Sequence, residues 1–189
     1  PQGAVYLSQP KDLRVPLLSL LWLPQEFYIW ALAIYHDFKT SRRHFAEFTL
    51  HIRCHLPLAI ARLIAWPVAG VMTLLCRSSR SIPVYRDKNA FKTMGASIKV
   101  LQAGHDIIIY PDIDYANADG GTELYDGFLY LERFYRHATL RHLNFIPVYI
   151  DEAERQVIIG QAIHFEDGDF MAQKEAVLQQ LSRALNGDL

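Results

Sequence analysis

Three short segments carry the residue types that bind small anions or end buried strands. Residues 82–87 read Ile-Pro-Val-Tyr-Arg-Asp, so that an apolar run delivers Arg86 at its end. Residues 110–112 read Tyr-Pro-Asp and deliver Asp112, with Pro111 placed 25 residues after Arg86. Residues 145–149 read Phe-Ile-Pro-Val-Tyr, with Pro147 a further 36 residues on. A guanidinium such as that of Arg86 binds phosphate bidentately and keeps its charge.

The sequence gives little support for a phosphate-binding loop, a nucleophilic serine or a metal site. No glycine-rich phosphate loop with a lysine occurs, and no serine lies in a nucleophile-elbow pattern. His51 and His55 lie four residues apart and could share a metal in a helix, but no acidic residue stands beside them. Lys88 and Lys92 follow Arg86 one helical turn apart, and either add to an anion site or are solvated surface charges. Arg86 is therefore the leading candidate for ligand binding.

The order and spacing of these segments resemble the phospholipid/glycerol acyltransferase family. Members of that family carry a strand that ends in arginine, then a Phe-Pro-Glu-Gly block, then an Ile-Pro-Val strand. The segment 161–165, Gln-Ala-Ile-His-Phe after a glycine, is similar to the last strand of the family. The resemblance extends from about residue 3 to residue 185, and its specificity lies in the combined order of motifs that are individually weak.

The resemblance implies a site and a reaction. Arg86, with Lys88 beside it, would bind the phosphate of a glycerophosphate or lysophospholipid acceptor. Asp112 takes the place of the family's glutamate or is simply a loop-capping acid, while Ile113 replaces the glycine and Asp114 replaces a threonine. The acyl donor would be acyl-CoA or an acyl carrier protein. The resemblance implies no bound metal or cofactor, because the thioester is already activated.

The largest departure from the family concerns its catalytic pair. Members place a histidine base and an orienting aspartate five positions apart just after the first strand, and Gln9 and Arg14 occupy those places here. The one literal match, His164 and Asp169, falls on the wrong side of the motif order. Other histidines after the second expected strand are alternative bases: His36, His44, His51 and His55. Three hypotheses stay open: an active acyltransferase, a non-catalytic relative that binds a lipid, an acyl carrier or a partner protein, and an unrelated α/β domain.

The elements that must position these residues alternate between short apolar runs and amphipathic runs. We expect strands at 4–8, 27–34, 82–85, 107–110, 145–150 and 156–163. Helices are expected at 15–23, from Ser41 to Cys54, from Asp87 or Asn89 to Gly104, at 126–137 and at 171–185. This alternation predicts a single α/β domain over 1–189, with a largely parallel or mixed central sheet and helices on both faces. Because the sequence begins at Pro1, a preceding N-terminal segment stays an open alternative.

The most apolar stretch runs from Leu56 to Cys76 and resembles a membrane span in composition. Arg62 interrupts it, and Pro57 and Pro67 punctuate it. A charge near the middle of a span costs about 2.5–3.5 kcal/mol. We therefore expect two short helices, buried in the core or lying at a membrane surface near the site.

The composition limits which binding partners and which cellular compartment we expect. Of the 189 residues 51% are apolar and 21% charged, with a formal net charge of −1. A globular chain without basic excess is not expected to bind nucleic acid. Cys54 and Cys76 lie in apolar stretches and are expected to be buried thiols, typical of a reducing compartment. We expect a cytoplasmic protein, peripheral at the membrane.

Overall fold

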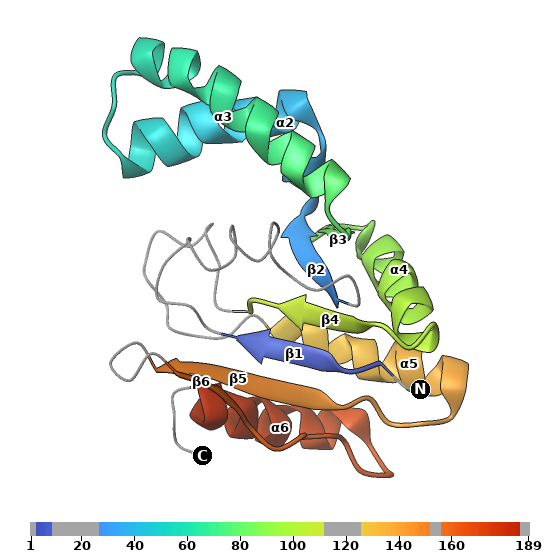
Figure 1. Ribbon diagram of the computed structural model, residues 1–189. Helices are drawn as coiled ribbons and strands as arrows, with labels where there is room; N and C mark the ends of the chain where they lie inside the picture. Colours follow the sequence, from blue (N-terminus) through green and yellow to red (C-terminus); the bar gives the residue numbers. More distant parts are fainter. Residues whose placement is uncertain (1–2, 9–26, 112–125, 152–155, 186–189) are drawn as a thin grey trace.

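The computed structural model describes residues 3–8, 27–111, 126–151 and 156–185, and they form one six-stranded sheet (Figure 1). The strand order is β3-β2-β4-β1-β5-β6. The strands are β1 Val5–Ser8, β2 Phe27–Leu32, β3 Ser81–Val84, β4 Asp106–Ile109, β5 Phe145–Asp151 and β6 Gln156–Ile159.

The sheet is mostly parallel. The five strands β1 to β5 run in the same direction, and β6 pairs antiparallel with β5. The expected α/β fold with a largely parallel or mixed sheet is therefore confirmed. The expected strand at 156–163 is shorter in the structure, because β6 ends at Ile159 and only an isolated bridge joins Ile163 to Phe145.

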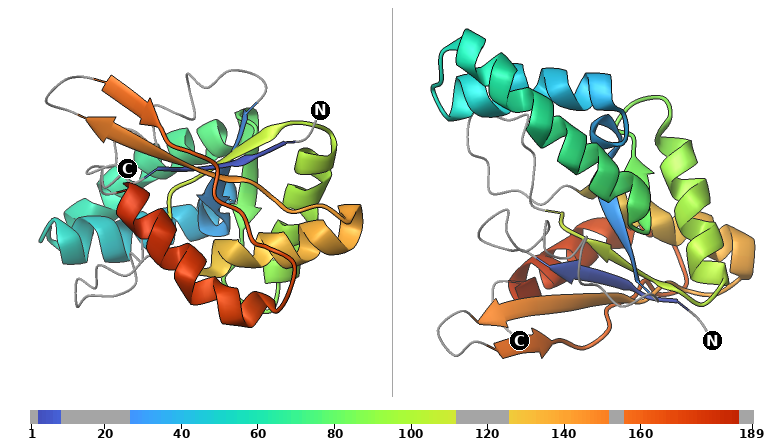
Figure 2. Two further views of the ribbon diagram at one scale, coloured as in Figure 1. Left: turned by 90° about the horizontal axis from the view of Figure 1, so that it is seen from below. Right: turned by 45° about the horizontal axis from the view of Figure 1, so that its top comes forward.

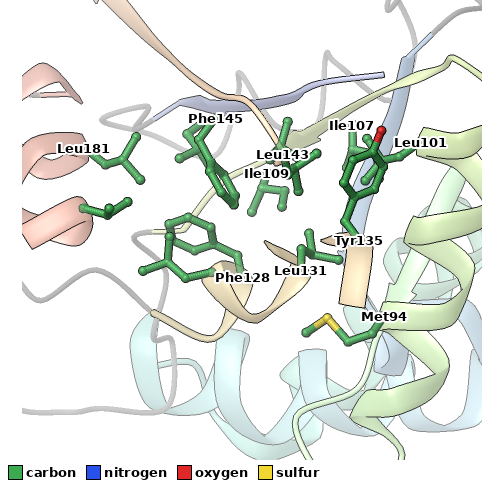
Figure 3. Packing of buried hydrophobic residues seen from close by; sticks show 14 of the residues in the cluster. Met94, Leu101, Ile107, Ile109, Phe128, Leu131, Tyr135, Leu143, Phe145 and Leu181 are labelled. Carbon is green, nitrogen blue, oxygen red and sulfur yellow. The ribbon is translucent and has the colours of Figure 1, made fainter. Parts of the chain in front are cut away.

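Three helices pack along the sheet and close the core. They are α4 Ala90–Gln102, α5 Tyr130–Thr139, which continues the 3₁₀ turn η3 Asp126–Leu129, and α6 Phe170–Leu185. Figure 3 shows the buried side chains between these helices and the strands. The residues Val5, Leu7, Ile107 and Ile109 alternate with half-buried neighbours, as strands with one face against a helical layer do. The helix expected at 15–23 lies outside the described residues.

The connection from β2 to β3 forms a long helical hairpin that extends away from the sheet (Figures 1 and 2). It begins with the 3₁₀ turn η1 Ala33–His36 and α2 Phe38–His44. The π-helical segment η2 Phe45–Arg53 continues α2, and α3 Leu58–Ser78 returns along both. We call residues 38–78 the helical hairpin. Its helix α3 is long and apolar enough to cross a membrane by length and composition.

The structure corrects three expectations about this hairpin. The first helix begins at Phe38 and is capped by Asp37, whose side chain accepts a hydrogen bond from the Thr40 backbone N–H at 2.9 Å, and Ser41 is buried within that helix. The stretch expected to form two short helices is one helix that continues through Pro67. Cys76 is buried as expected, but Cys54 is exposed in the turn between the helices.

Tertiary packing explains why Pro67 does not end α3. A proline inside a helix removes one hydrogen bond and costs about 3 kcal/mol. Ala61, Ala65 and Ala69 form a small-residue stripe on the opposite side that is fully buried. Because α2 and η2 pack along α3 over much of its length, close contact offsets the local cost.

Candidate functional site

The carboxyl ends of the parallel strands meet at one edge of the sheet, which we call the carboxyl edge. There β1 ends at Ser8, β4 is followed by Tyr110 and Pro111, and β3 is followed by Tyr85 and Arg86. Strands β1 and β4 are neighbours, whereas β3 is separated from β4 by β2. With a strand spacing of about 4.8 Å, β3 lies about 10 Å from β4 and about 14 Å from β1. This spacing permits one ligand of small-molecule size to reach all three strand ends.

Within this edge, the strand order indicates that the ends of β1 and β4 are the place where a ligand is expected. The chain leaves β1 toward β2, on the far side of β4, and it leaves β4 toward β5, on the far side of β1. The two connections thus depart in opposite directions from adjacent strands. In open parallel sheets this switch point is the usual place for a ligand.

A buried threonine holds the turn that carries Arg86. The Thr93 hydroxyl of α4 donates to the Pro83 carbonyl at 2.9 Å and accepts from the Tyr85 N–H at 2.9 Å. Thr93 is buried and Arg86, one residue after Tyr85, is exposed. The turn is therefore anchored by α4, and it carries the exposed Arg86 at the carboxyl edge.

The residues that follow Arg86 form the start of α4. Asp87 accepts a hydrogen bond from the Asn89 N–H at 2.8 Å, and this bond lowers the pKa of the Asp87 carboxyl. Lys88 is exposed in the same turn, and the Lys92 ammonium lies 5.9 Å from the centre of the Tyr85 ring. Arg86 and Lys88 thus lie in the turn after β3, and Lys92 lies in the first turn of α4.

Ser8, at the end of β1, was not singled out from the sequence. Its side chain is buried, and its hydroxyl oxygen has no hydrogen-bond partner among the described residues. Ser41, Thr73 and Ser79 also carry buried hydroxyls without a partner among the described residues, so this feature alone does not mark the end of β1 as a site. A serine that closes an apolar strand just before the Gln9 position is the only signal in the sequence that could have indicated it.

The predicted site residues divide into two groups. Arg86 and Lys88 are described and lie together at the carboxyl edge. Gln9, Arg14 and Asp112 lie outside the described residues, as do Ile113 and Asp114. The strand ends that lead to them, Ser8 and Pro111, lie at the carboxyl edge, so the predicted convergence of Gln9, Arg14, Arg86 and Asp112 stays a prediction.

Three of the alternative bases make contacts within the described residues. The His36 ring contacts the Ser81 hydroxyl at the start of β3, at 2.8 Å, and the Leu32 carbonyl at the end of β2, at 3.3 Å, and burial lowers its pKa. His44 stacks on Phe48 within the helical hairpin, and burial lowers its pKa as well. His51, in the hairpin, contacts the Leu56 carbonyl at 2.7 Å. None of these contacts involves a carboxylate that could orient a catalytic base.

Within the described residues, a histidine pairs with carboxylates only at the opposite edge. His142 Nδ1 lies 2.7 Å from Glu132 Oε1, and its Nε2 lies 3.3 Å from Asp167 Oδ1. His142 precedes β5, so this cluster sits at the amino end of a strand that runs toward the carboxyl edge. A cavity of about 360 Å³ opens beside the cluster, lined in part by Arg136, Glu166 and Phe170. The described part of the chain holds no group of three or more His, Cys, Asp or Glu residues arranged to bind a metal.

Fold and edge together define an α/β protein with a basic strand end at the carboxyl side of a mostly parallel sheet. Comparison with protein-family models finds no match, and neither the curated proteins nor the solved structures contain one. The resemblance to the acyltransferase family therefore rests on the sequence motifs alone.

Proposed function

We propose that this chain is a divergent relative of the phospholipid/glycerol acyltransferases that binds the phosphate of a glycerophosphate or lysophospholipid at the carboxyl edge. The observation that carries the proposal is the placement of Arg86. Its turn is anchored by Thr93, and it lies at the edge where β1 and β4 also end. A charged fork held on a rigid element binds phosphate at a smaller entropic cost than a mobile one.

The charge of the site supports an anionic acceptor. Lys88 and Lys92 add positive charge near Arg86. Between Arg86 and Lys92 the sequence holds one carboxylate, that of Asp87. Asp87 is already held by the Asn89 N–H. The phosphate of a glycerolipid supplies the matching anion, and its free hydroxyl would be the group that receives an acyl chain.

Acyl transfer at such a site would be a thioester exchange. The acceptor hydroxyl oxygen attacks the thioester carbonyl carbon, the carbon–sulfur bond breaks, and the hydroxyl proton leaves with the thiol of coenzyme A or the carrier protein. A positioned base is worth about 10²–10⁴ in rate for this kind of step. Glutamine at position 9 cannot take up a proton near neutral pH, so we expect transfer by this chain to be weak or absent.

A second candidate function follows from Gln9 and Arg14. With an amide and a cation in place of the catalytic pair, the same fold suits a non-catalytic protein that binds a lipid, an acyl carrier or a partner enzyme. Arg14 would add positive charge to a site that already has Arg86. An anionic ligand is expected under both hypotheses, and they differ only in whether an acyl group moves.

Binding of glycerol 3-phosphate, measured by calorimetry, tests the shared part of the proposal. Arg86→Gln removes the charge and the fork, and we expect it to weaken binding by about tenfold or more. Arg141→Gln is the matched control, because Arg141 is exposed in the turn before β5, at the opposite edge. Equal affinity of the two variants, or no binding by the natural chain, would contradict the proposal.

A further inference from the structure

The outward face of α3 is apolar from Ile60 to Leu74. Leu63 and Leu74 are 75% and 67% exposed, and Ile60 and Val71 lie on the same side by helical spacing. This face is opposite the buried stripe of Ala61, Ala65 and Ala69. The hairpin holds eight of the large apolar side chains that the described structure exposes: Ile52, Ile60, Leu63, Ile64, Trp66, Val68, Val71 and Leu74. A contiguous apolar surface of this kind marks a docking site.

The helical hairpin is also the most basic part of the chain. Residues 38–78 contain one acidic residue, Glu47, and six basic residues, which gives a formal net charge of +5 in a chain whose total is −1. The basic residues are Lys39, Arg42, Arg43, Arg53, Arg62 and Arg77. The Arg42 guanidinium lies 5.4 Å from the centre of the Trp66 ring, so a cation and an exposed aromatic ring meet at the border of the apolar face. Aromatic rings and basic side chains at such a border suit the headgroup layer of a bilayer.

The partner helix decides how the hairpin can meet a bilayer. With 21 residues, α3 is about 31 Å long, close to the thickness of the hydrocarbon core. However, α2 and η2 pack along it and carry Lys39, Arg43, Glu47 and Arg53, all of them exposed. Charged side chains are costly in hydrocarbon. The hairpin therefore fits a bilayer surface, with the outward face of α3 among the acyl chains and Arg42 and Arg62, which border that face, among the headgroups.

We propose that the helical hairpin docks this protein onto an anionic lipid surface without crossing it. The inference does not depend on acyl transfer or on ligand binding at the carboxyl edge. A second copy of the chain is a less suitable occupant, because two hairpins of charge +5 placed face to face repel each other. Anionic lipid headgroups have the opposite charge and match both properties of the hairpin.

Vesicle flotation of the full chain, without acyl donor or acceptor, tests the proposal. One set of vesicles is phosphatidylcholine alone, and the other contains about 30% phosphatidylglycerol as the anionic lipid. We expect the natural chain to float with the anionic vesicles and to bind phosphatidylcholine at least about fivefold less. Raising the salt from about 0.1 M to about 1 M shortens the screening length from about 10 Å to about 3 Å and should reduce this preference.

Two pairs of variants separate the apolar and the basic contributions. Leu63→Gln with Leu74→Gln should weaken vesicle binding by more than about tenfold. Its control is Leu140→Gln with Met171→Gln, two exposed apolar residues outside the hairpin. Lys39→Gln with Arg62→Gln should lower binding to anionic vesicles about fivefold per charge, and Lys99→Gln with Arg141→Gln is its control.

Three results would overturn the proposal. One is equal binding to both kinds of vesicle, and another is no binding by a natural chain whose circular dichroism shows a folded protein. The third is a dimer, seen by analytical ultracentrifugation, that Leu63→Gln with Leu74→Gln separates while the natural chain stays unbound to vesicles. The last result would identify the apolar face as an interface between two copies.

Discussion

The buried hydroxyl of Thr93 in α4 donates a hydrogen bond to the carbonyl oxygen of Pro83 in β3, at 2.9 Å. The same oxygen accepts the Tyr85 N–H. One side chain thus joins the first helix after β3 to the strand end that carries Arg86. The geometry of the proposed phosphate site depends on this link.

We expect Thr93→Val to destabilise the protein. Valine has nearly the same shape but leaves the Tyr85 N–H without its partner, which costs about 1–3 kcal/mol. The free energy of unfolding in urea should fall by that amount, and glycerol 3-phosphate should bind more weakly. Thr93→Ser keeps the hydroxyl and is the control. A Thr93→Val protein as stable as the natural chain would show that the hydrogen bonds do not anchor the turn.

Acyl transfer separates the two candidate functions. We expect little or no incorporation of radiolabelled acyl groups into lipid when the natural chain meets acyl-CoA and lysophosphatidic acid. Gln9→His with Arg14→Asp restores a base and its orienting carboxylate, and activity should rise by up to about 10²–10⁴ over the natural chain.

The outcomes of this assay are distinct. Robust turnover by the natural chain would contradict the weak-transfer expectation and return attention to His36, His44, His51 and His55. Adding Arg86→Gln to the double variant is the control, since it removes the expected phosphate ligand and should abolish the gain. If neither chain turns over, the binding function is the one left to test.

Glu132 should be important for stability although it lies away from the proposed site. Glu132 is 2% exposed. Its carboxylate accepts a hydrogen bond from the Leu143 N–H at 2.8 Å and contacts His142. Glu132→Leu leaves a buried N–H without its partner, so the free energy of unfolding should fall by about 1–3 kcal/mol. Asp167→Asn changes an 87% exposed side chain of the same cluster and should cost less than about 1 kcal/mol. Equal losses in chemical denaturation would argue against a structural role for burial of Glu132.

Stability should decrease as the pH falls through the ordinary histidine range. Burial lowers the pKa of both His36 and His44 below 6.5 in the folded chain. As the pH falls below 6.5, the unfolded chain therefore binds protons that the folded chain does not, and the folded state loses stability until the folded pKa is passed. Thermal unfolding between about pH 8 and about pH 5 measures this slope.

A conservative variant measures how much of this dependence of stability on pH comes from His44. His44→Phe keeps an aromatic ring beside Phe48 but cannot be protonated, so its melting temperature should depend less on pH. The dependence that remains belongs in part to His36. A slope that His44→Phe does not reduce would contradict the assignment.

Much of the fold could be predicted because, in the sheet, the local sequence pattern and the tertiary packing favour the same structure. Each expected strand lies in the six-stranded sheet, since runs such as Ile107–Ile109 have the length and apolar character that a covered strand requires. Expectations were wrong where a local signal competed with packing. Ser41 has a good capping side chain, but Asp37 caps the helix, and Pro67 breaks helices in isolation but lies within α3.

The candidate site was less accessible from the sequence. Arg86 could be selected, because an arginine that ends an apolar strand has few structural reasons to be there. Ser8 could not, because whether a hydroxyl finds a partner depends on the strands beside it and on the side chains above it. The same holds for the pairing of Glu132 with His142, ten residues apart, which requires α5 and β5 to meet in one turn.

By itself, the sequence determined the class of fold, the order of its strands along the chain and the presence of a basic residue at the end of β3, because these depend on side-chain types and their periods. The tertiary structure decided which strands are neighbours and which face of α3 is covered. The Leu56–Cys76 stretch illustrates the physical reason. Its composition suits a core, a span or a surface helix equally, and only the packing of α2 and η2 against Ala61, Ala65 and Ala69 leaves Leu63 and Leu74 facing outward.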